Sequence, residues 1–188
     1  MKLSILLLLS CYLYGTNLQV PTDLQKRAEF FRDDALNASA SVDGKVAPEL
    51  LLALAITEST LDPYALRVER GFWKRYGDGI KRFVLDSPSK VDNRWMRYPD
   101  IYSASYGICQ IMLQTALEAG WQMKRFPTEL CDPETNFELA AKLLSRHLRN
   151  VDGDLEKALL RYNGGGDPNY PDRVFKWLRL VEEWKLFA

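Results

Sequence analysis

The sequence is organised around Pro48–Pro63, PELLLALAITESTLDP, in which the run Leu50–Ile56 carries no polar side chain. A helix over this run is apolar on every face, so it belongs either in a membrane or in the centre of a core. A bilayer requires about 20 apolar residues, and this run is far too short, which leaves the core. Pro48 suits the first helical turn, and Asp62-Pro63 indicates the end, because the residue before a proline disfavours the α region.

Glu58 falls in the last turn of this predicted helix. Burial disfavours the charged form of a carboxyl group, and the negative end of the helix dipole has the same effect. Together they favour a carboxyl group that is protonated near neutral pH, as a general acid must be. The alternative is a solvated glutamate at a fraying helix end, and the stretch taken alone favours that alternative.

The composition is that of one ordinary domain. The 188 residues are 47% hydrophobic, which is enough for a substantial core. The 25 Lys and Arg residues balance the 25 Asp and Glu residues, so no overall positive field favours nucleic acid as a partner. Five Trp, nine Tyr and eight Phe residues supply aromatic rings for a core or for contacts with sugars.

The first residues have the pattern of a secretory signal. Met1-Lys2 is positively charged, Leu3–Leu9 is apolar, and Ser10 is a small residue. The segment Leu8–Cys11, LLSC, also resembles a bacterial lipobox, in which the cysteine is acylated and becomes the mature N-terminus. Cleavage after Gly15 and an uncleaved anchor are the alternatives to lipidation at Cys11.

This signal sets the expected organisation of the chain. Residues 1–15 are predicted to form the signal sequence, residues 16–23 a tether and residues 24–188 the folded domain. The protein is then exported to the cell envelope, to the periplasm, and its one contact with a membrane is an N-terminal lipid anchor. Cys109 and Cys131 remain in the mature chain, where they either pair in an oxidising compartment or stay as two buried thiols.

Helical spacing and caps predict further helices, and no stretch predicts a convincing strand, so the domain is expected to be all-α. The predicted helices are Asp23–Ala40 with Thr22 or Asp23 as its cap, an apolar helix within Ser103–Leu117, Phe137–Asn150 after the cap Asp132 and Pro133, Asp154–Tyr162, and Arg173–Leu186.

The segment Leu66–Ser103 is the least regular part and mixes basic, acidic and aromatic residues. Short helices are predicted at Gly71–Tyr76 and Gly79–Leu85. Basic and aromatic residues together can bind single-stranded nucleic acid, but the interspersed acidic residues and the export signal favour the wall or lid of a sugar-binding cleft. A surface loop packed by its own aromatic rings explains the composition about as well.

Metal and nucleophile chemistry have little support in the sequence. His147 is the one histidine, and there is neither a Cys/His cluster nor an HExxH spacing for zinc. A Ser/His/Asp set with a nucleophile elbow is also missing. No metal and no other cofactor is therefore expected.

Four short segments occur in order along the chain: Glu58–Ala65 (ESTLDPYA), Ser105–Met112 (SYGICQIM), Asp132–Asn136 (DPETN) and Ala158–Gly165 (ALLRYNGG). They resemble, in turn, the motifs E-S-x-F-x-P-x-A, G-L-M-Q-I-M-P, D-P-x-x-N and A-L-x-A-Y-N-A-G of the soluble (SLT-type) lytic transglycosylases, relatives of goose-type lysozyme. The match spans about Pro48 to Val174. It implies a lysozyme-like helical domain built around a buried catalytic helix.

The sequence departs from these motifs at several places. Cys109 stands where the family has methionine, Leu113 where it has proline, and Gly164 where it has alanine. About forty residues separate the glutamate motif from the glutamine motif, which is longer than in many members. The segment Leu66–Ser103 therefore resembles an insertion that enlarges the wall beside the catalytic helix and affects substrate preference.

The resemblance implies cleavage of the β-1,4 bond between N-acetylmuramic acid (MurNAc) and N-acetylglucosamine (GlcNAc) in peptidoglycan. Glu58 would protonate the leaving oxygen and then accept the proton of the muramic acid C6 hydroxyl as that oxygen attacks C1, giving a 1,6-anhydro sugar. The resemblance implies six substrate-binding residues. Tyr162 would form a hydrogen bond near Glu58 and hold its orientation, Asn163 would position the sugar or the loop, and Gln110 would form hydrogen bonds to sugar substituents. Ser105 would contact the muramyl side, Cys109 would pack against sugar, and Tyr170 would stack at the cleft edge.

Alternatives remain for both residues and function. A satisfied buried polar network is the alternative for Tyr162 and Gln110. The alternative enzyme is a lysozyme-like muramidase in which Glu69 or another carboxylate activates water, and the alternative outside catalysis is a glycan-binding envelope protein. In each case the expected partner is the glycan strand of peptidoglycan and not nucleic acid. The protein is expected to be a monomer.

Overall fold

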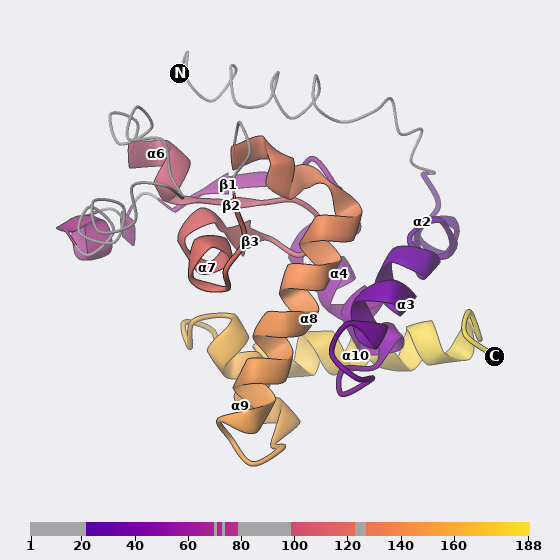
Figure 1. Ribbon diagram of the computed structural model, residues 1–188. Helices are drawn as coiled ribbons and strands as arrows, with labels where there is room; N and C mark the ends of the chain where they lie inside the picture. Colours follow the sequence, from indigo (N-terminus) through magenta and orange to yellow (C-terminus); the bar gives the residue numbers. More distant parts are fainter. Residues whose placement is uncertain (1–21, 70, 73, 79–98, 123–126) are drawn as a thin grey trace.

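The computed structural model describes residues 22–69, 71–72, 74–78, 99–122 and 127–188. Within these ranges the chain forms a helical domain with one small sheet (Figure 1). The predicted signal sequence, lipidation site Cys11 and most of the tether lie outside the described residues, as does the predicted helix Gly79–Leu85. No helix in the described ranges combines the length and apolar character needed to span a bilayer.

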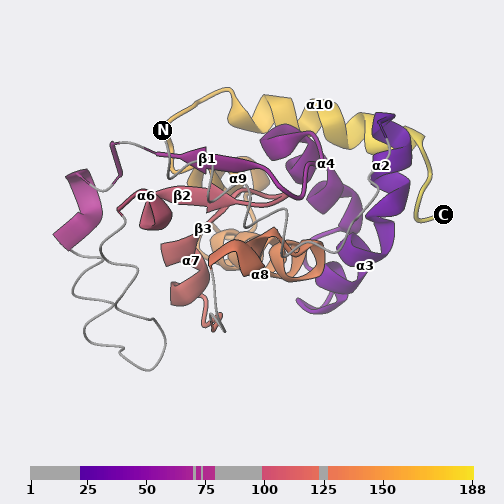
Figure 2. The ribbon, with the colours of Figure 1, turned by 90° about the horizontal axis from the view of Figure 1, so that it is seen from above.

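The helix α4, Pro48–Ser59, lies at the centre of the domain, as the sequence predicts. Every side chain of Leu50–Ile56 is at most 5% exposed. The helix α10, Tyr170–Glu183, packs along α4, and α3, Arg32–Ala40, packs against another side of it (Figure 2). Neighbours on several sides explain why this helix is apolar on every face.

The single helix predicted over Asp23–Ala40 is two helices in the structure. The helix α2, Leu24–Phe30, begins after the cap Asp23, whose side chain accepts a hydrogen bond from the Lys26 amide. Phe31 leaves the helical conformation, with φ −98° and ψ 11°, and α3 begins at the next residue. The Phe31 ring is fully buried, so tertiary packing breaks the helix where the local sequence favours continuity.

Three short antiparallel strands form a sheet in the order β1-β2-β3, which corrects the expectation that the domain has no strand. They are β1 (Leu66–Val68), β2 (Ala104–Tyr106) and β3 (Ile111–Met112), with Leu66 opposite Tyr106 and Ser105 opposite Met112. Strands of two or three residues are too short to show the alternation that identifies a strand in a sequence. The domain remains mostly helical.

The described part of the predicted insertion, residues 66–103, begins with the strand β1 and ends where β2 begins. Its base is closed by a hydrogen bond from the Glu69 amide to the Ser103 carbonyl (2.7 Å). Residues 71–72 and 74–78 are helical, close to the predicted Gly71–Tyr76, and α6, Pro99–Tyr102, precedes β2.

The second half of the described chain is helical and follows the predicted caps. The apolar helix predicted within Ser103–Leu117 is shorter, because the strands occupy its start. Asp132 and Asp154 cap their helices by accepting from the Thr135 and Lys157 amides. The elements are α7 (Leu113–Glu118), the 3-10 helix η2 (Pro127–Cys131), α8 (Pro133–Arg149) and α9 (Leu155–Tyr162), followed by α10.

Candidate active site

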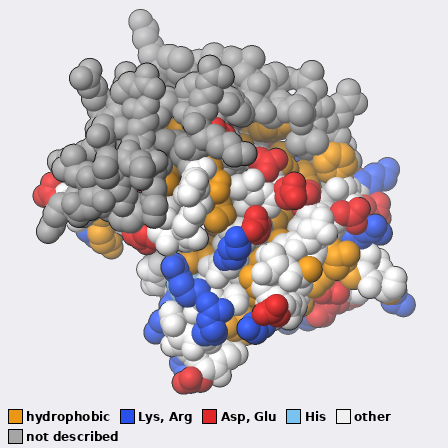
Figure 3. Space-filling view, viewed as in Figure 1, with side chains coloured by type: hydrophobic (Ala, Val, Ile, Leu, Met, Phe, Trp, Pro, Cys, Tyr) orange, Lys and Arg blue, Asp and Glu red, His pale blue; other side chains and the backbone are white. Residues whose placement is uncertain are grey.

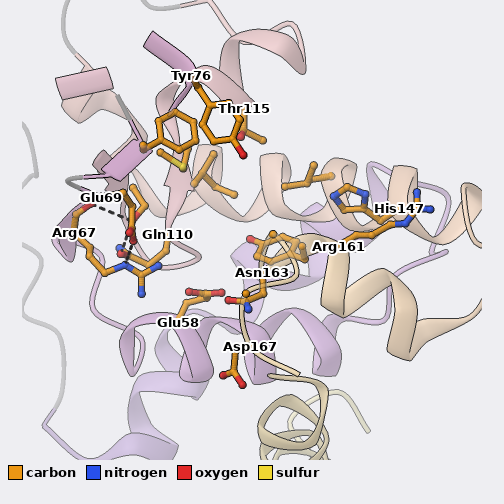
Figure 4. A pocket seen from close by; sticks show the side chains of 18 of the residues that line it. Glu58, Arg67, Glu69, Tyr76, Gln110, Thr115, His147, Arg161, Asn163 and Asp167 are labelled. Atoms are coloured by element: carbon orange, nitrogen blue, oxygen red, sulfur yellow. Dashed lines mark hydrogen bonds and ion pairs between the residues drawn. The ribbon is translucent and has the colours of Figure 1, made fainter. Parts of the chain in front are cut away.

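A cleft of about 730 Å³ opens between the end of α4, the sheet, the helical residues 71–72 and 74–78, α8 and the end of α9. Figure 4 shows Glu58 beside Asn163 in the middle of this cleft, with Tyr76 and Thr115 towards one end and His147 and Arg161 towards the other. Of the predicted site residues, the cleft is lined by Glu58, Ser105, Gln110, Tyr162 and Asn163.

Glu58 reaches the cleft because α4 ends immediately after it. Thr60 has left-handed backbone angles, φ 58° and ψ 37°, which stop the helix. The Ser59 hydroxyl donates to the Ile108 carbonyl (2.7 Å) and ties the helix end to the turn between β2 and β3. Glu58 therefore projects from a rigid, buried helix into an open cleft.

The environment of Glu58 raises its pKa, and the main cause is burial. A hydrogen bond from Tyr170 and the charges of Arg67 and Arg173 lower the pKa, whereas the charge of Glu69 raises it. The net direction agrees with the sequence-based expectation. Glu58 is therefore a partly buried carboxyl group with a fixed hydrogen-bond partner. It is not the solvated glutamate at a fraying helix end that was the alternative.

That partner is Tyr170, whose hydroxyl donates to Oε1 of Glu58 at 2.6 Å. The Tyr170 side chain is only 1% exposed, so the prediction that it stacks at the cleft edge is wrong. It is the first residue of α10 and shares a buried face with Val174 and Val181, and the packing of α10 on α4 brings it to Glu58. Burial and the nearby Glu58 carboxylate raise the pKa of Tyr170, so its phenol remains a donor.

The predicted partner of Glu58, Tyr162, has a different contact. Its hydroxyl donates to the Cys109 carbonyl at 2.9 Å, which joins the end of α9 to the turn between the strands. Burial is the main cause that raises the pKa of Tyr162. Tyr162 thus lines the cleft and also belongs to a polar network, the alternative that the sequence left open.

Cys109 and Gln110 lie in the turn that Asn136 holds in place. Asn136 is fully buried; its Oδ1 accepts from the Cys109 amide (2.7 Å), and its Nδ2 donates to the carbonyls of Tyr106 (2.9 Å) and Leu130 (2.7 Å). A Cβ at Gly107, where φ is +73°, would lie 2.6 Å from the Leu130 carbonyl oxygen. Asn136 is the last residue of the segment that resembles D-P-x-x-N, but the sequence alone does not reveal its role in holding this turn.

The Gln110 amide is largely committed within the protein. Its Nε2 donates to the carbonyls of Ala65 (3.1 Å) and Gly107 (2.9 Å), and its Oε1 accepts from the Ser105 hydroxyl (2.8 Å). One lone pair of Oε1 is left for a sugar. Ser105 itself is 2% exposed.

Cys109 is fully buried, so the prediction that it packs against sugar is wrong. Its carbonyl, rather than its side chain, serves the site by accepting from Tyr162. Burial also raises the pKa of the Cys109 thiol, which keeps it protonated. Cys109 and Cys131 are both buried thiols rather than a disulfide, which is one of the two alternatives that the sequence allowed.

Asn163 and the glycines after it form the rim of the cleft beside Glu58 (Figure 4). Asn163 ends α9, and Gly164 and Gly165 follow with φ of 72° and 74°. The Gly165 amide donates to the Leu160 carbonyl (2.8 Å), a helix-ending arrangement that favours glycine. Asp167 at the end of this loop forms an ion pair with Arg173.

Further charged residues also line the cleft. Glu69, the second carboxylate of the muramidase alternative, pairs with Arg67 through Oε1 and Nε at 2.6 Å. Arg146, His147 and Arg161 lie along α8 and α9. Their positions on helix surfaces gave no signal, because the facing of two helices decides which surface residues share a cleft. Among the described residues, no group of three or more His, Cys, Asp or Glu is arranged to hold a metal ion.

A family model, that of the transglycosylase SLT domain, matches residues 35–171. The comparisons with curated proteins and with solved structures gave no significant match. The matched region contains Glu58, the turn held by Asn136, and Tyr170, and it covers well over half of the 188 residues. It confirms the resemblance found in the sequence motifs. The chain therefore belongs to the transglycosylase SLT domain family.

Proposed function

We propose that this protein is a peptidoglycan lytic transglycosylase that cleaves the MurNAc-β-1,4-GlcNAc bond, with Glu58 as its single catalytic acid and base. Membership of the SLT family implies a glycan-cleaving enzyme that acts on peptidoglycan. The observation that supports the specific role of Glu58 is its placement: a partly buried carboxyl group in the middle of the cleft, with a raised pKa and a fixed tyrosine donor.

The proposed reaction uses Glu58 twice. In the first step its protonated carboxyl donates a proton to the glycosidic oxygen as the bond to C1 of MurNAc breaks. In the second step the Glu58 carboxylate accepts the proton of the MurNAc C6 hydroxyl, and that oxygen bonds to C1. The products are a 1,6-anhydro-MurNAc end and a free GlcNAc hydroxyl, and no water is consumed. Because the nucleophile is part of the substrate, proximity favours this step.

Tyr170 has a positioning role in this proposal. Its hydroxyl holds one oxygen of Glu58, and this contact also fixes the orientation of the other oxygen. The hydrogen bond also stabilises the carboxylate that forms after the first proton transfer. Tyr162 ties the end of α9 to the turn between β2 and β3 through the Cys109 carbonyl, and Asn163 lies beside Glu58 where it can contact the sugar (Figure 4).

A muramidase is the second candidate, and one observation favours it: Glu69 lines the same cleft as Glu58. A hydrolase needs a second carboxylate with room for a water molecule. The ion pair of Glu69 with Arg67 occupies one of the oxygens of that carboxylate. We favour the structural role of Glu69 for this reason.

Product analysis separates these candidates. Purified peptidoglycan is digested with the protein, and the released fragments are identified by mass spectrometry. Anhydro-MurNAc ends support the transglycosylase, and reducing MurNAc ends would make the protein a hydrolase. Tight binding to peptidoglycan without either product would make the protein a non-catalytic glycan-binding protein.

Export and lipidation are proposals about the N-terminal segment. If Cys11 is acylated, the processed protein fractionates with membranes, and Cys11→Ala releases it or blocks processing. A native protein that is fully soluble and begins beyond Cys11 would contradict lipidation.

A further inference from the structure

One end of the cleft carries a group of cationic and polar side chains, Arg146, His147 and Arg161, which we call the α8–α9 corner. All three residues line the cleft. Figure 4 shows His147 and Arg161 at this end, with Asn163 between Arg161 and Glu58. In Figure 3, Lys and Arg side chains gather over the part of the surface where Figure 1 shows α9 and the end of α8.

The arginines of this corner differ from the other arginines of the cleft. Arg67 forms an ion pair with Glu69, and Arg75 lies over the Tyr76 ring, 6.0 Å from its centroid. Within the described ranges, the side chains of Arg146 and Arg161 form neither an ion pair nor a hydrogen bond nor a ring contact. They are therefore the cleft cations that remain available to a ligand.

His147 adds to this corner a polar atom that has no hydrogen-bond partner among the described residues. That atom is the buried Nδ1. Burial and the charges of Arg146 and Arg161 lower the pKa of His147, and all three side chains line the same cleft.

The helix dipole alone does not account for the corner. Arg146 and His147 lie in the last turn of α8, and Arg161 lies in the last turn of α9, where cations are favourable. The dipole explains why cations are favourable at the end of each helix. It does not explain why cations from two helices line the same cleft. The motif A-L-x-A-Y-N-A-G has alanine where this chain has Arg161, so the motif does not require a cation at this position.

We propose that the α8–α9 corner binds a carboxylate of the peptide attached to MurNAc, so that the enzyme prefers glycan strands that carry their peptides. This inference rests on the proposed function. Arginine pairs with carboxylates through two parallel hydrogen bonds. In strands that carry peptides, the lactyl group of MurNAc is bound as an amide and the sugars are neutral. The carboxylates of the substrate are then those of the peptide.

The test uses soluble, uncross-linked strands in three forms. The first carries its peptides unchanged, the second has all carboxylates converted to amides, and the third has its peptides removed by an amidase. We expect wild-type kcat/KM to be about tenfold higher for the unchanged strands than for the amidated strands, the size of a charge-assisted contact. The peptide-free strands, whose one carboxylate is the lactyl group, should be cleaved like the amidated ones.

The double variant Arg146→Gln/Arg161→Gln should lose this preference by slowing cleavage of the unchanged strands alone. The matched control is Arg179→Gln, an exposed arginine on α10 outside the cleft lining, which should keep the preference. Equal wild-type rates on unchanged and amidated strands would overturn the proposal. So would an equal loss on both by the double variant. Full activity on peptide-free strands that depends on the two arginines would assign the lactyl carboxylate instead.

A binding measurement separates this inference from the proposed function. The same strands are titrated by calorimetry into Glu58→Gln, with and without the two arginine substitutions. If wild type produces no anhydro ends from any strand, the proposed function fails, and the affinity ratio still decides the role of the corner. A tenfold affinity preference for unchanged strands that the double variant loses supports the corner, and equal affinities contradict it.

Discussion

Glu58 and Asp34 are both carboxyl groups whose pKa is raised mainly by burial, yet their surroundings differ. The pKa of Asp34 is raised to about 6 by burial and by Asp132, Glu134 and Asp33. The charged groups that shift its pKa are all acidic, and Asp34 does not line the cleft. Glu58 instead has the Tyr170 hydroxyl on one oxygen and the charges of Arg67 and Arg173 nearby.

The comparison shows that a raised pKa alone does not identify a catalytic acid. A group that must both donate and accept a proton needs its two forms to be close in free energy. At Glu58, burial favours the protonated form, while Tyr170 and the arginines favour the carboxylate. At Asp34 every contribution acts in the same direction. Opposed contributions inside a cleft are therefore the more informative signal.

The largest expected effect separates the two carboxyl groups directly. Glu58→Gln keeps the shape of the side chain but removes its proton, so turnover should fall by roughly two to four orders of magnitude, the size of a lost general acid. Asp34→Asn should leave turnover unchanged. Both are measured as release of anhydro-muropeptides, with circular dichroism as the check on folding. Near-normal activity of a folded Glu58→Gln protein would remove the proposed mechanism.

Tyr170→Phe should have the next largest effect, because it removes the donor while keeping the buried ring. Loss of a hydrogen bond to a charged group predicts a fall in kcat of about tenfold or more. The hydrogen bond lowers the pKa of Glu58, so its removal raises that pKa further. The protonated acid then persists to higher pH, and the alkaline limb of the pH–rate profile should move up. Tyr162→Phe is the matched control, and an unmoved limb in Tyr170→Phe would contradict the role of Tyr170.

Glu69→Gln should move the same limb in the opposite direction. The charge of Glu69 raises the pKa of Glu58, and Arg67, which pairs with Glu69, lowers it. Removing the acid leaves Arg67 unopposed, so the pKa of Glu58 falls and activity is lost at lower pH. The rate at the optimum should change by less than about tenfold. A dead variant, together with reducing-end products from the parent protein, would instead identify Glu69 as the second carboxylate of a hydrolase.

The smallest effect concerns the stability of Asp34→Asn. A carboxyl group with a raised pKa in the folded state contributes stability below its unfolded pKa, and that contribution is lost as pH rises from about 4 to about 6. At pH 7 the asparagine variant should be more stable than wild type by about 1 kcal/mol or less, because the group is partly exposed and screened by solvent. Urea unfolding at pH 4 and pH 7 measures this difference. Equal stabilities at both pH values would show that Asp34 is not strained by its acidic neighbours.

The sequence alone determined the features that depend on neighbouring residues. The apolar run Leu50–Ile56 predicts a core helix, and the caps Asp132 and Asp154 predict where two later helices begin. These signals act within one or two helical turns, so no knowledge of the fold is needed.

Only the tertiary structure decided which distant residues meet. Tyr170 rather than Tyr162 contacts Glu58, across 112 positions of the chain, because α10 packs along α4. The split at Phe31, the short strands and the α8–α9 corner have the same origin. In each case packing between elements outweighs, or adds to, preferences that are weak locally. The motifs therefore predicted the chemistry of the site, while the facing of the helices decided which side chains surround it.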